Sequence, residues 1–230
     1  MSSNKNLNEF LKKVKELNLK KEIYNAFLSV DRNIFFDPFF RDRISSFSPI
    51  PVGFGEHSDD INVLTKMLTI LSPHKKWEIL EIGTGSGYST ALLASMVKKV
   101  VTIEYHEKLA LEAKERLIAN GFFNIKFIAG DFSELDDTAG HFDAAIIHAG
   151  CIHSPYAALN LLKKNGAAVF CMGTAMMQQI TLYKNIASDD DDPFRRYKFF
   201  DTCTIPSIKG KYGYSNPELD IIVETGRGDI

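Results

Sequence analysis

The segment that most constrains the fold of this chain is the run LEIGTGSGY at residues 80–88. It ends an apolar stretch and opens a segment with helical patterning, and Glu104 follows at the end of a second apolar stretch. Strand, glycine turn, helix, strand and acid is the order typical of a nucleotide-binding βαβ unit. The glycines let the backbone approach a ligand closely, and the acid can accept hydrogen bonds from both ribose hydroxyls. The alternative is a glycine-rich turn that only joins a strand to a helix.

The spacing of the glycines selects among nucleotide ligands. A dinucleotide fingerprint reads G-x-G-x-x-G, and its third glycine would fall on Tyr88, which disfavours an NAD-linked oxidoreductase. The chain also lacks the G-x-x-x-x-G-K-[ST] loop that cradles a triphosphate. The G-x-G-x-G pattern instead resembles motif I of class I S-adenosylmethionine (SAM) methyltransferases. This resemblance implies SAM as cofactor, held by Gly83, Thr84, Gly85, Ser86, Gly87, Glu104, Tyr105, Asp131 and Phe132.

Strands alternate with helices between residues 77 and 172, which predicts parallel βαβ units. We expect strands at 77–82, 100–104, 125–129, 142–148 and 167–172, and helices at 89–97, 107–120 and 155–162. The fold class is therefore α/β, a Rossmann-like methyltransferase with a mostly parallel central sheet, helices on both faces and a late antiparallel addition. The late strands are expected at 198–205 and 219–224.

The remaining segments are interpreted as parts of one domain over residues 1–230. Residues 1–60 supply helices within about 5–30 and an ordered loop at 31–55, whose phenylalanines need burial. A helix is expected at 59–71, residues 61–175 form the SAM-binding core, and residues 176–230 form C-terminal strands and loops. The acidic run at 189–192 is interpreted as a solvated loop.

Composition narrows the possible partners and location. A net charge of −2 and a pI near 6.3 give no electrostatic case for nucleic acid. No apolar run approaches the roughly 18–20 residues of a membrane span, and the amino terminus lacks a signal-like apolar region. We therefore expect a monomeric cytoplasmic protein without membrane contact. The spacing of histidines, cysteines and acids predicts no metal site, and the three cysteines are expected to be free and buried.

A second resemblance extends beyond the glycine motif, from about Val30 to about Gly213. The segments Asp31-Arg32 with Phe35-Phe36, PVGFG at 51–55, LEIGTGSGY at 80–88 and the strand at 166–173 are similar to those of protein-L-isoaspartate O-methyltransferases. Cys171 stands where that family usually has proline. The resemblance implies a repair enzyme that methylates the isoaspartyl carboxylate of damaged proteins or peptides.

The chain departs from this family at the acceptor segment. Where the family reads Q-T-I-S-Q-P after G-x-G, this chain reads EHSDDI at 56–61, so that Asp59 takes the place of the serine that holds the acceptor. An ionised carboxylate cannot donate a hydrogen bond to an acidic acceptor, and two charges about 4 Å apart repel by roughly 4 kcal/mol at an effective dielectric near 20. We expect Asp59 as the catalytic position, and substrate contacts from His57, Ser58, Asp60 and His148.

Several interpretations stay open at this point. Ser58 could replace the family serine, a cationic His57 could offset the acids, and Ser58 or Asp59 could cap the following helix. The enzyme alternative is a diverged methyltransferase with another acceptor, for which His57 or Asp59 could serve as base if that acceptor is neutral. The alternative without catalysis is a protein that binds SAM or peptide but does not transfer the methyl group.

Overall fold

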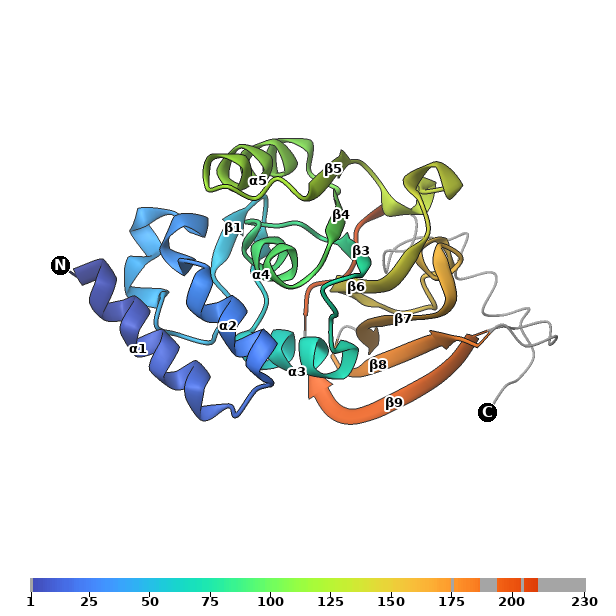
Figure 1. Cartoon of the computed structure of the whole chain (residues 1–230), viewed down its shortest axis with the longest axis horizontal. Coiled ribbons are helices and arrows are strands. Elements are labelled where there is room, and N and C mark those ends of the chain that lie inside the picture. Colours follow the sequence, from blue (N-terminus) through green and yellow to red (C-terminus); the bar gives the residue numbers. More distant parts are fainter. Residues whose placement is uncertain (1, 175, 187–193, 204, 211–230) are drawn as a thin grey trace.

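The computed structural model describes residues 2–174, 176–186, 194–203 and 205–210. Its main feature is a twisted sheet in the strand order β5-β4-β3-β6-β7-β8-β9 (Figure 1). The five strands from β5 to β7 run parallel, whereas β8 and β9 are antiparallel to their neighbours. In chain order these strands are β3 Glu78–Ile82, β4 Lys99–Glu104, β5 Ile125–Ala129, β6 Phe142–Cys151, β7 Leu162–Gly173, β8 Gln178–Asn185 and β9 Phe194–Cys203. The predicted α/β class is confirmed.

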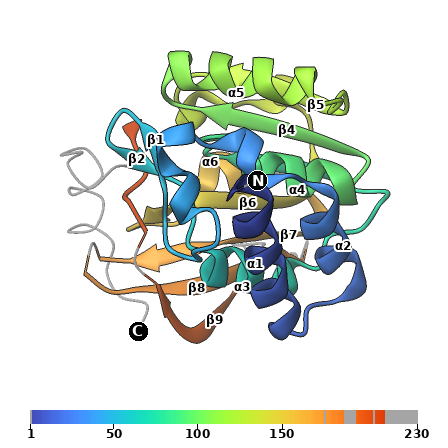
Figure 2. The same cartoon turned by 90° about the vertical axis from the view of Figure 1, so that its left-hand side faces the viewer.

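Helices cover both faces of the sheet, as the pattern predicted. The alternation of side chains along a strand sends Ile79 and Ile146 to one face and Leu80 and Ile147 to the other. The first face packs against the N-terminal helices and α4, and the second against α6 (Figure 2). The helices are α1 Ser2–Glu16, α2 Lys21–Ser29, α3 Ile61–Leu71, α4 Tyr88–Met96, α5 Glu107–Ala119 and α6 Tyr156–Leu159.

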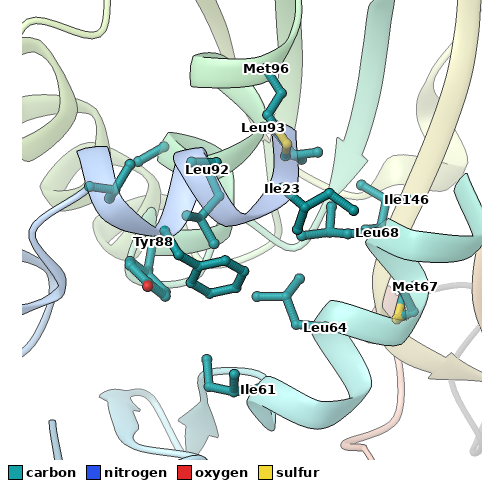
Figure 3. Close-up of a cluster of buried hydrophobic side chains, with 14 of the residues drawn as sticks. Ile23, Ile61, Leu64, Met67, Leu68, Tyr88, Leu92, Leu93, Met96 and Ile146 are labelled. Carbon is teal, nitrogen blue, oxygen red and sulfur yellow. The ribbon is translucent and has the colours of Figure 1, made fainter. Parts of the chain in front are cut away.

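The larger core lies between α2, α3 and α4, where apolar side chains from all three helices meet Ile146 of β6 (Figure 3). The helix α4 begins directly after the glycine motif, and all of its residues except Ser95 are buried, so that it depends on this core for its position. Tyr88 is 3% exposed and its ring contacts the rings of Phe27, Phe35 and Phe36. Tyr88, which stands where a dinucleotide-binding motif has its third glycine, therefore anchors the glycine motif against the N-terminal segment.

A buried arginine fixes the covering segment that precedes the site. This covering segment, which starts at residue 31, contains the short helices η1 Arg32–Phe35 and η2 Pro38–Arg43. The hairpin of β1 Pro51–Gly53 and β2 Glu56–His57 follows them. Arg32 donates through Nη1 to the carbonyls of Ile44 at 2.7 Å and Ser46 at 2.6 Å, and its guanidinium lies over the ring of Phe10. Burial lowers the pKa of Arg32 to about 10, so that the side chain is still a cation at neutral pH.

Several expectations about local structure were wrong. Phe39 was expected to be buried in the covering segment, but it is 84% exposed on the short helix η2. The helix expected to continue to Leu162 ends at Leu159, because β7 starts at Leu162 and pairs with Phe142. The strand β8 was not predicted. The short helices η3 Phe132–Glu134 and η4 Asp137–Ala139 occupy the loop between β5 and β6. The expected strand at 219–224 and the acidic run at 189–192 lie outside the described residues.

The cysteines also differ from expectation. Cys151 is a free buried thiol, and burial raises its pKa to about 12. Cys171 on β7 and Cys203 at the end of β9, by contrast, form a disulfide, with Cα atoms 6.8 Å apart. The two residues are 32 positions apart, and no spacing pattern signals their pairing, because a bond across a sheet depends on strand order.

The position of Gly87 yields a stability test with a matched control. Gly87 has φ +88°, and a Cβ added there would lie 3.0 Å from Leu117 of α5; Gly121 has φ +86°, but a Cβ added there would meet nothing within 4 Å. Gly121→Ala therefore adds backbone strain alone, at a cost of about 1 kcal/mol. Gly87→Ala adds overpacking, for a total of about 2–4 kcal/mol. Urea unfolding measures both losses, and equal losses would contradict this packing.

Candidate active site

A cavity opens at the carboxyl ends of β3, β4 and β6, where parallel sheets bind ligands. Its volume is about 920 Å³, including its open mouth. The sequence-predicted residues brought together in its lining are His57, Ser58, Asp59, Gly83, Thr84, Gly85, Ser86, Glu104, Tyr105, Phe132 and His148. Gly87, Asp60 and Asp131 lie outside the lining.

The glycine motif forms the floor of this cavity as a loop fixed from behind. Gly83 donates its N–H to the carbonyl of Ile103 at 2.8 Å, which ties the loop to β4. Thr84 shares a hydrogen bond of 2.7 Å with Thr102, and Arg116 of α5 donates to the carbonyl of Ser86 at 2.7 Å. The loop is therefore rigid before any ligand binds, which reduces the entropy cost of binding.

Glu104 lies beside this loop with its carboxylate almost completely buried. Oε2 accepts the N–H of Gly85 at 2.9 Å, and Oε1 accepts the N–H of His106 at 3.1 Å. A carboxylate offers about four lone-pair sites, so both oxygens retain acceptor capacity toward a diol. Glu104 thus orders the loop and remains available to a ribose.

The acceptor end of the cavity contains a buried histidine between two carboxylates. Nδ1 of His148 lies 2.8 Å from Oδ2 of Asp59, and Nε2 lies 3.1 Å from Oε1 of Glu81. Nδ1 has no partner in hydrogen-bond geometry, so its contact with Asp59 is an ion pair. Burial alone lowers the pKa of His148, but the charges of Asp59 and Glu81 outweigh it and raise this pKa to about 10. His148 is therefore an imidazolium at neutral pH.

Glu81 belongs to the site although the sequence analysis assigned it no role. Its side chain is completely buried and accepts hydrogen bonds from Ser89 at 2.9 Å, Thr90 at 2.6 Å and Thr102 at 2.7 Å, in addition to the His148 contact. The signal was an acid inside an apolar strand, because a buried carboxylate requires donors. Glu81 joins β3, α4, β4 and β6 at one point.

The remaining residues of the acceptor segment are held by local hydrogen bonds. Asp60, which was expected to contact substrate, accepts the N–H of Asn62 at 2.7 Å and caps α3. The alternative interpretation, in which Ser58 or Asp59 caps this helix, is wrong because Asp60 is the cap. Ser58 accepts the N–H of Ile50 through its hydroxyl at 3.0 Å, and His57 is exposed at the rim.

The turn after β5 contributes an aromatic wall. Phe132 lines the cavity and is buried, whereas Asp131 accepts the N–H of Ser133 at 2.9 Å and caps η3. A Cβ at Gly210 would overlap the carboxylate of Asp131, so the C-terminal segment passes directly over this acid. Tyr105, directly after β4, is half exposed and also lines the cavity.

Sequence reasoning missed a strap, residues 205–210, that runs along the cavity beside β1 and β2 (red in Figure 2). The buried side-chain amide of Gln178 pairs with both backbone groups of Ile205, each at 3.1 Å. Gly150 donates to Pro206 and accepts from Ile208. At the far end Lys209 lies 3.2 Å from Glu56. The sequence did not predict this strap because a single glutamine side chain, rather than a neighbouring strand, pairs with its backbone.

The fold and the site together define a class I methyltransferase. The defining features are the glycine loop after β3, the acid at the end of β4, and the parallel sheet extended by antiparallel strands. Among the described residues no helix could cross a membrane, and no three His, Cys, Asp or Glu side chains are grouped to hold a metal ion.

Comparison with known proteins identifies the family. The profile of the protein-L-isoaspartate(D-aspartate) O-methyltransferase (PCMT) family matches residues 2–198, and the chain belongs to this family. A protein-L-isoaspartate O-methyltransferase of Petrotoga mobilis is 32% identical over 195 residues, which cover 84% of this chain and 90% of that protein. Protein-L-isoaspartate O-methyltransferase 2 of Archaeoglobus fulgidus is 28% identical over 208 residues, 89% of this chain and 93% of the relative.

A solved structure confirms the fold. A candidate protein-L-isoaspartate O-methyltransferase from Plasmodium falciparum, crystallised with S-adenosyl-L-homocysteine, superposes with a TM-score of 0.73. The match covers 87% of this chain and 97% of that one, at 19% sequence identity.

The raised pKa of His148 makes the stability of the protein depend on alkaline pH. The folded value of about 10 exceeds the unfolded value near 6.5, so the native state binds the extra proton between these limits. The stabilisation is complete below about pH 6.5 and is lost as the pH rises through about 10. Urea unfolding across this range should show a larger loss for the wild type than for His148→Gln. The exposed-site variant His57→Gln is the control, and parallel curves for His148→Gln and wild type would contradict the pairing.

Proposed function

We propose that this protein transfers the methyl group of SAM to the free α-carboxylate of isoaspartyl residues in damaged proteins or peptides. Family membership and the assembled cavity support the proposal. The action on a protein substrate fits the names of its relatives. The monomeric state and the cytoplasmic location stay predictions.

We assign the cavity lining to the parts of SAM. In this assignment Glu104 would bind the ribose hydroxyls, the loop at 83–86 the amino-acid tail, and Phe132 one face of the adenine, and the presence of all of them in the lining supports it. When bound, SAM supplies a methyl group on a sulfonium; transfer to a carboxylate oxygen forms an O–CH₃ bond and breaks the C–S bond, whose electron pair stays on sulfur, so that no proton moves. The chain's own contribution is to position the acceptor and exclude water.

The observation that carries the choice of acceptor is the state of His148. A histidine held as imidazolium cannot take a proton, and the Asp59 carboxylate beside it is already paired. The buried acceptor end therefore favours a group that is nucleophilic without deprotonation, such as a carboxylate. A neutral hydroxyl or amine would need a base, and the groups of the expected acceptor site left for that role are the exposed His57 and the second oxygen of Asp59.

The charge repulsion expected from Asp59 and Asp60 is smaller than the sequence suggested. Asp60 caps α3 outside the cavity lining, and Asp59 lies against a cation. An ion pair presents a weaker field to an approaching carboxylate than a lone acid does. Asp59 in place of the family serine is therefore compatible with an acidic acceptor.

Methyl transfer to a synthetic isoaspartyl peptide tests the proposal directly. With labelled SAM, we expect incorporation into the isoaspartyl peptide and none into its normal aspartyl isomer. The product should lose its label in mild alkali because it is an ester. Binding of SAM without transfer would instead support a binding protein, and an alkali-stable product would support a different acceptor.

Glu104→Ala tests the cofactor site. Loss of hydrogen bonds between the ribose and a charged acceptor should weaken SAM binding by about 1–3 kcal/mol, or roughly 5- to 150-fold. Calorimetry measures the change, with Glu107→Ala in the first turn of α5 as the control. Thermal unfolding of both variants checks that the loop still folds. Unchanged SAM affinity in a folded Glu104→Ala protein would remove Glu104 from the site.

A further inference from the structure

The acceptor end of the cavity carries more negative than positive charge. Asp59 and Glu81 are two carboxylates that share one imidazolium, which gives the three side chains a formal net charge of −1. Lys209 of the strap pairs with Glu56 of β2, which also lies 3.5 Å from His106, two residues after the end of β4. The excess charge is therefore not cancelled by this lysine.

The excess charge belongs to Asp59 rather than to Glu81. Glu81 is completely buried and receives three hydroxyl hydrogen bonds, which disperse its charge. Asp59 lines the cavity, and its Oδ2 lies 2.8 Å from Nδ1 of His148. Its other oxygen remains able to accept a hydrogen bond from a ligand.

His148 itself is a positioning residue rather than a substrate contact. Its two ring nitrogens face the two carboxylates, with Nδ1 2.8 Å from Asp59 and Nε2 3.1 Å from Glu81, so the ring ties Asp59 to the buried Glu81. His148 also lies close to the glycine loop, because a Cβ added at Gly83 would be 3.3 Å from the Cβ of His148, and the residue therefore relates Asp59 to that loop.

We propose that Asp59 is a specificity residue that pairs with a nitrogen donor on the same α-carbon that bears the acceptor carboxylate, so that isoaspartate at a peptide's free amino terminus is preferred over internal isoaspartate. This inference rests on the proposed function. In an isoaspartyl residue the chain continues through the side-chain carbonyl, which leaves the α-carboxylate free beside the α-nitrogen. At an amino terminus that nitrogen is an ammonium.

The negative charge of Asp59 favours an ammonium over an amide as its partner. A hydrogen bond between two ionised groups is roughly twice as strong as one between neutral groups. The ammonium also offsets the charge of the acceptor carboxylate next to it, which reduces the repulsion from Asp59. An internal isoaspartyl residue offers only a neutral amide N–H, so no positive charge offsets its acceptor carboxylate.

The test compares two peptides of one sequence, each beginning with isoaspartate, one with a free amine and one N-acetylated. At about pH 6.5 the free α-amine is protonated, and the wild type should methylate that peptide with at least about tenfold higher kcat/KM. In Asp59→Asn, which keeps the shape, the ratio should fall to about 1. The control Asp60→Asn removes a neighbouring acid yet keeps a capping side chain, and it should retain the wild-type ratio. SAM affinity should be the same in all three proteins.

The possible outcomes distinguish the proposed role of Asp59 from the proposed methyl transfer itself. Equal rates for the two peptides in the wild type would overturn the inference even if Asp59→Asn does not fold, and would leave the proposed function intact. An equal loss on both peptides in Asp59→Asn, or a loss of SAM affinity there, would also overturn it, because Asp59 would then serve structure or cofactor. No transfer to either peptide would contradict the proposed function itself.

Discussion

The buried cation of His148 is the interaction on which the arrangement of the site depends. A charge removed from water costs several kcal/mol unless partners replace the solvent, and here Asp59 and Glu81 are those partners. Glu81 in turn accepts hydrogen bonds from hydroxyl groups on α4 and β4. The segment before α3 that contains Asp59 is thereby attached to β3, the strand that carries the glycine loop. The acceptor side and the cofactor side of the cavity are therefore fixed relative to each other.

The cofactor half of the cavity is rigid for a different reason. Its loop is fixed by backbone and hydroxyl hydrogen bonds to β4, and Tyr88 anchors the start of α4 in the aromatic core. The strap completes the wall through Gln178 and Gly150. Most of the orientation that methyl transfer requires is therefore present before the ligands bind, which is how a reaction without proton transfer can be accelerated.

Local patterns predicted the parts of this protein that depend on local physics. The strands at 78–82 and 125–129 and the glycine loop followed from periodicity and backbone freedom, and Glu104 followed from its place at the end of a strand. Contacts between distant segments escaped prediction. The pairing of Asp59 with His148 joins residues far apart in sequence, the strap depends on a side chain that imitates a strand, and the disulfide depends on strand order.

His148 is a cation at neutral pH because two carboxylates hold it. An NMR titration of the histidine ring protons, assigned with His148→Gln, tests it most directly. The claim predicts that His148 titrates near pH 10, far above an exposed histidine near 6.5, and that Asp59→Asn lowers this midpoint. A midpoint near 6.5 in the wild type would contradict the claim, because the ring would then be largely neutral and Asp59 would stand without a cationic partner.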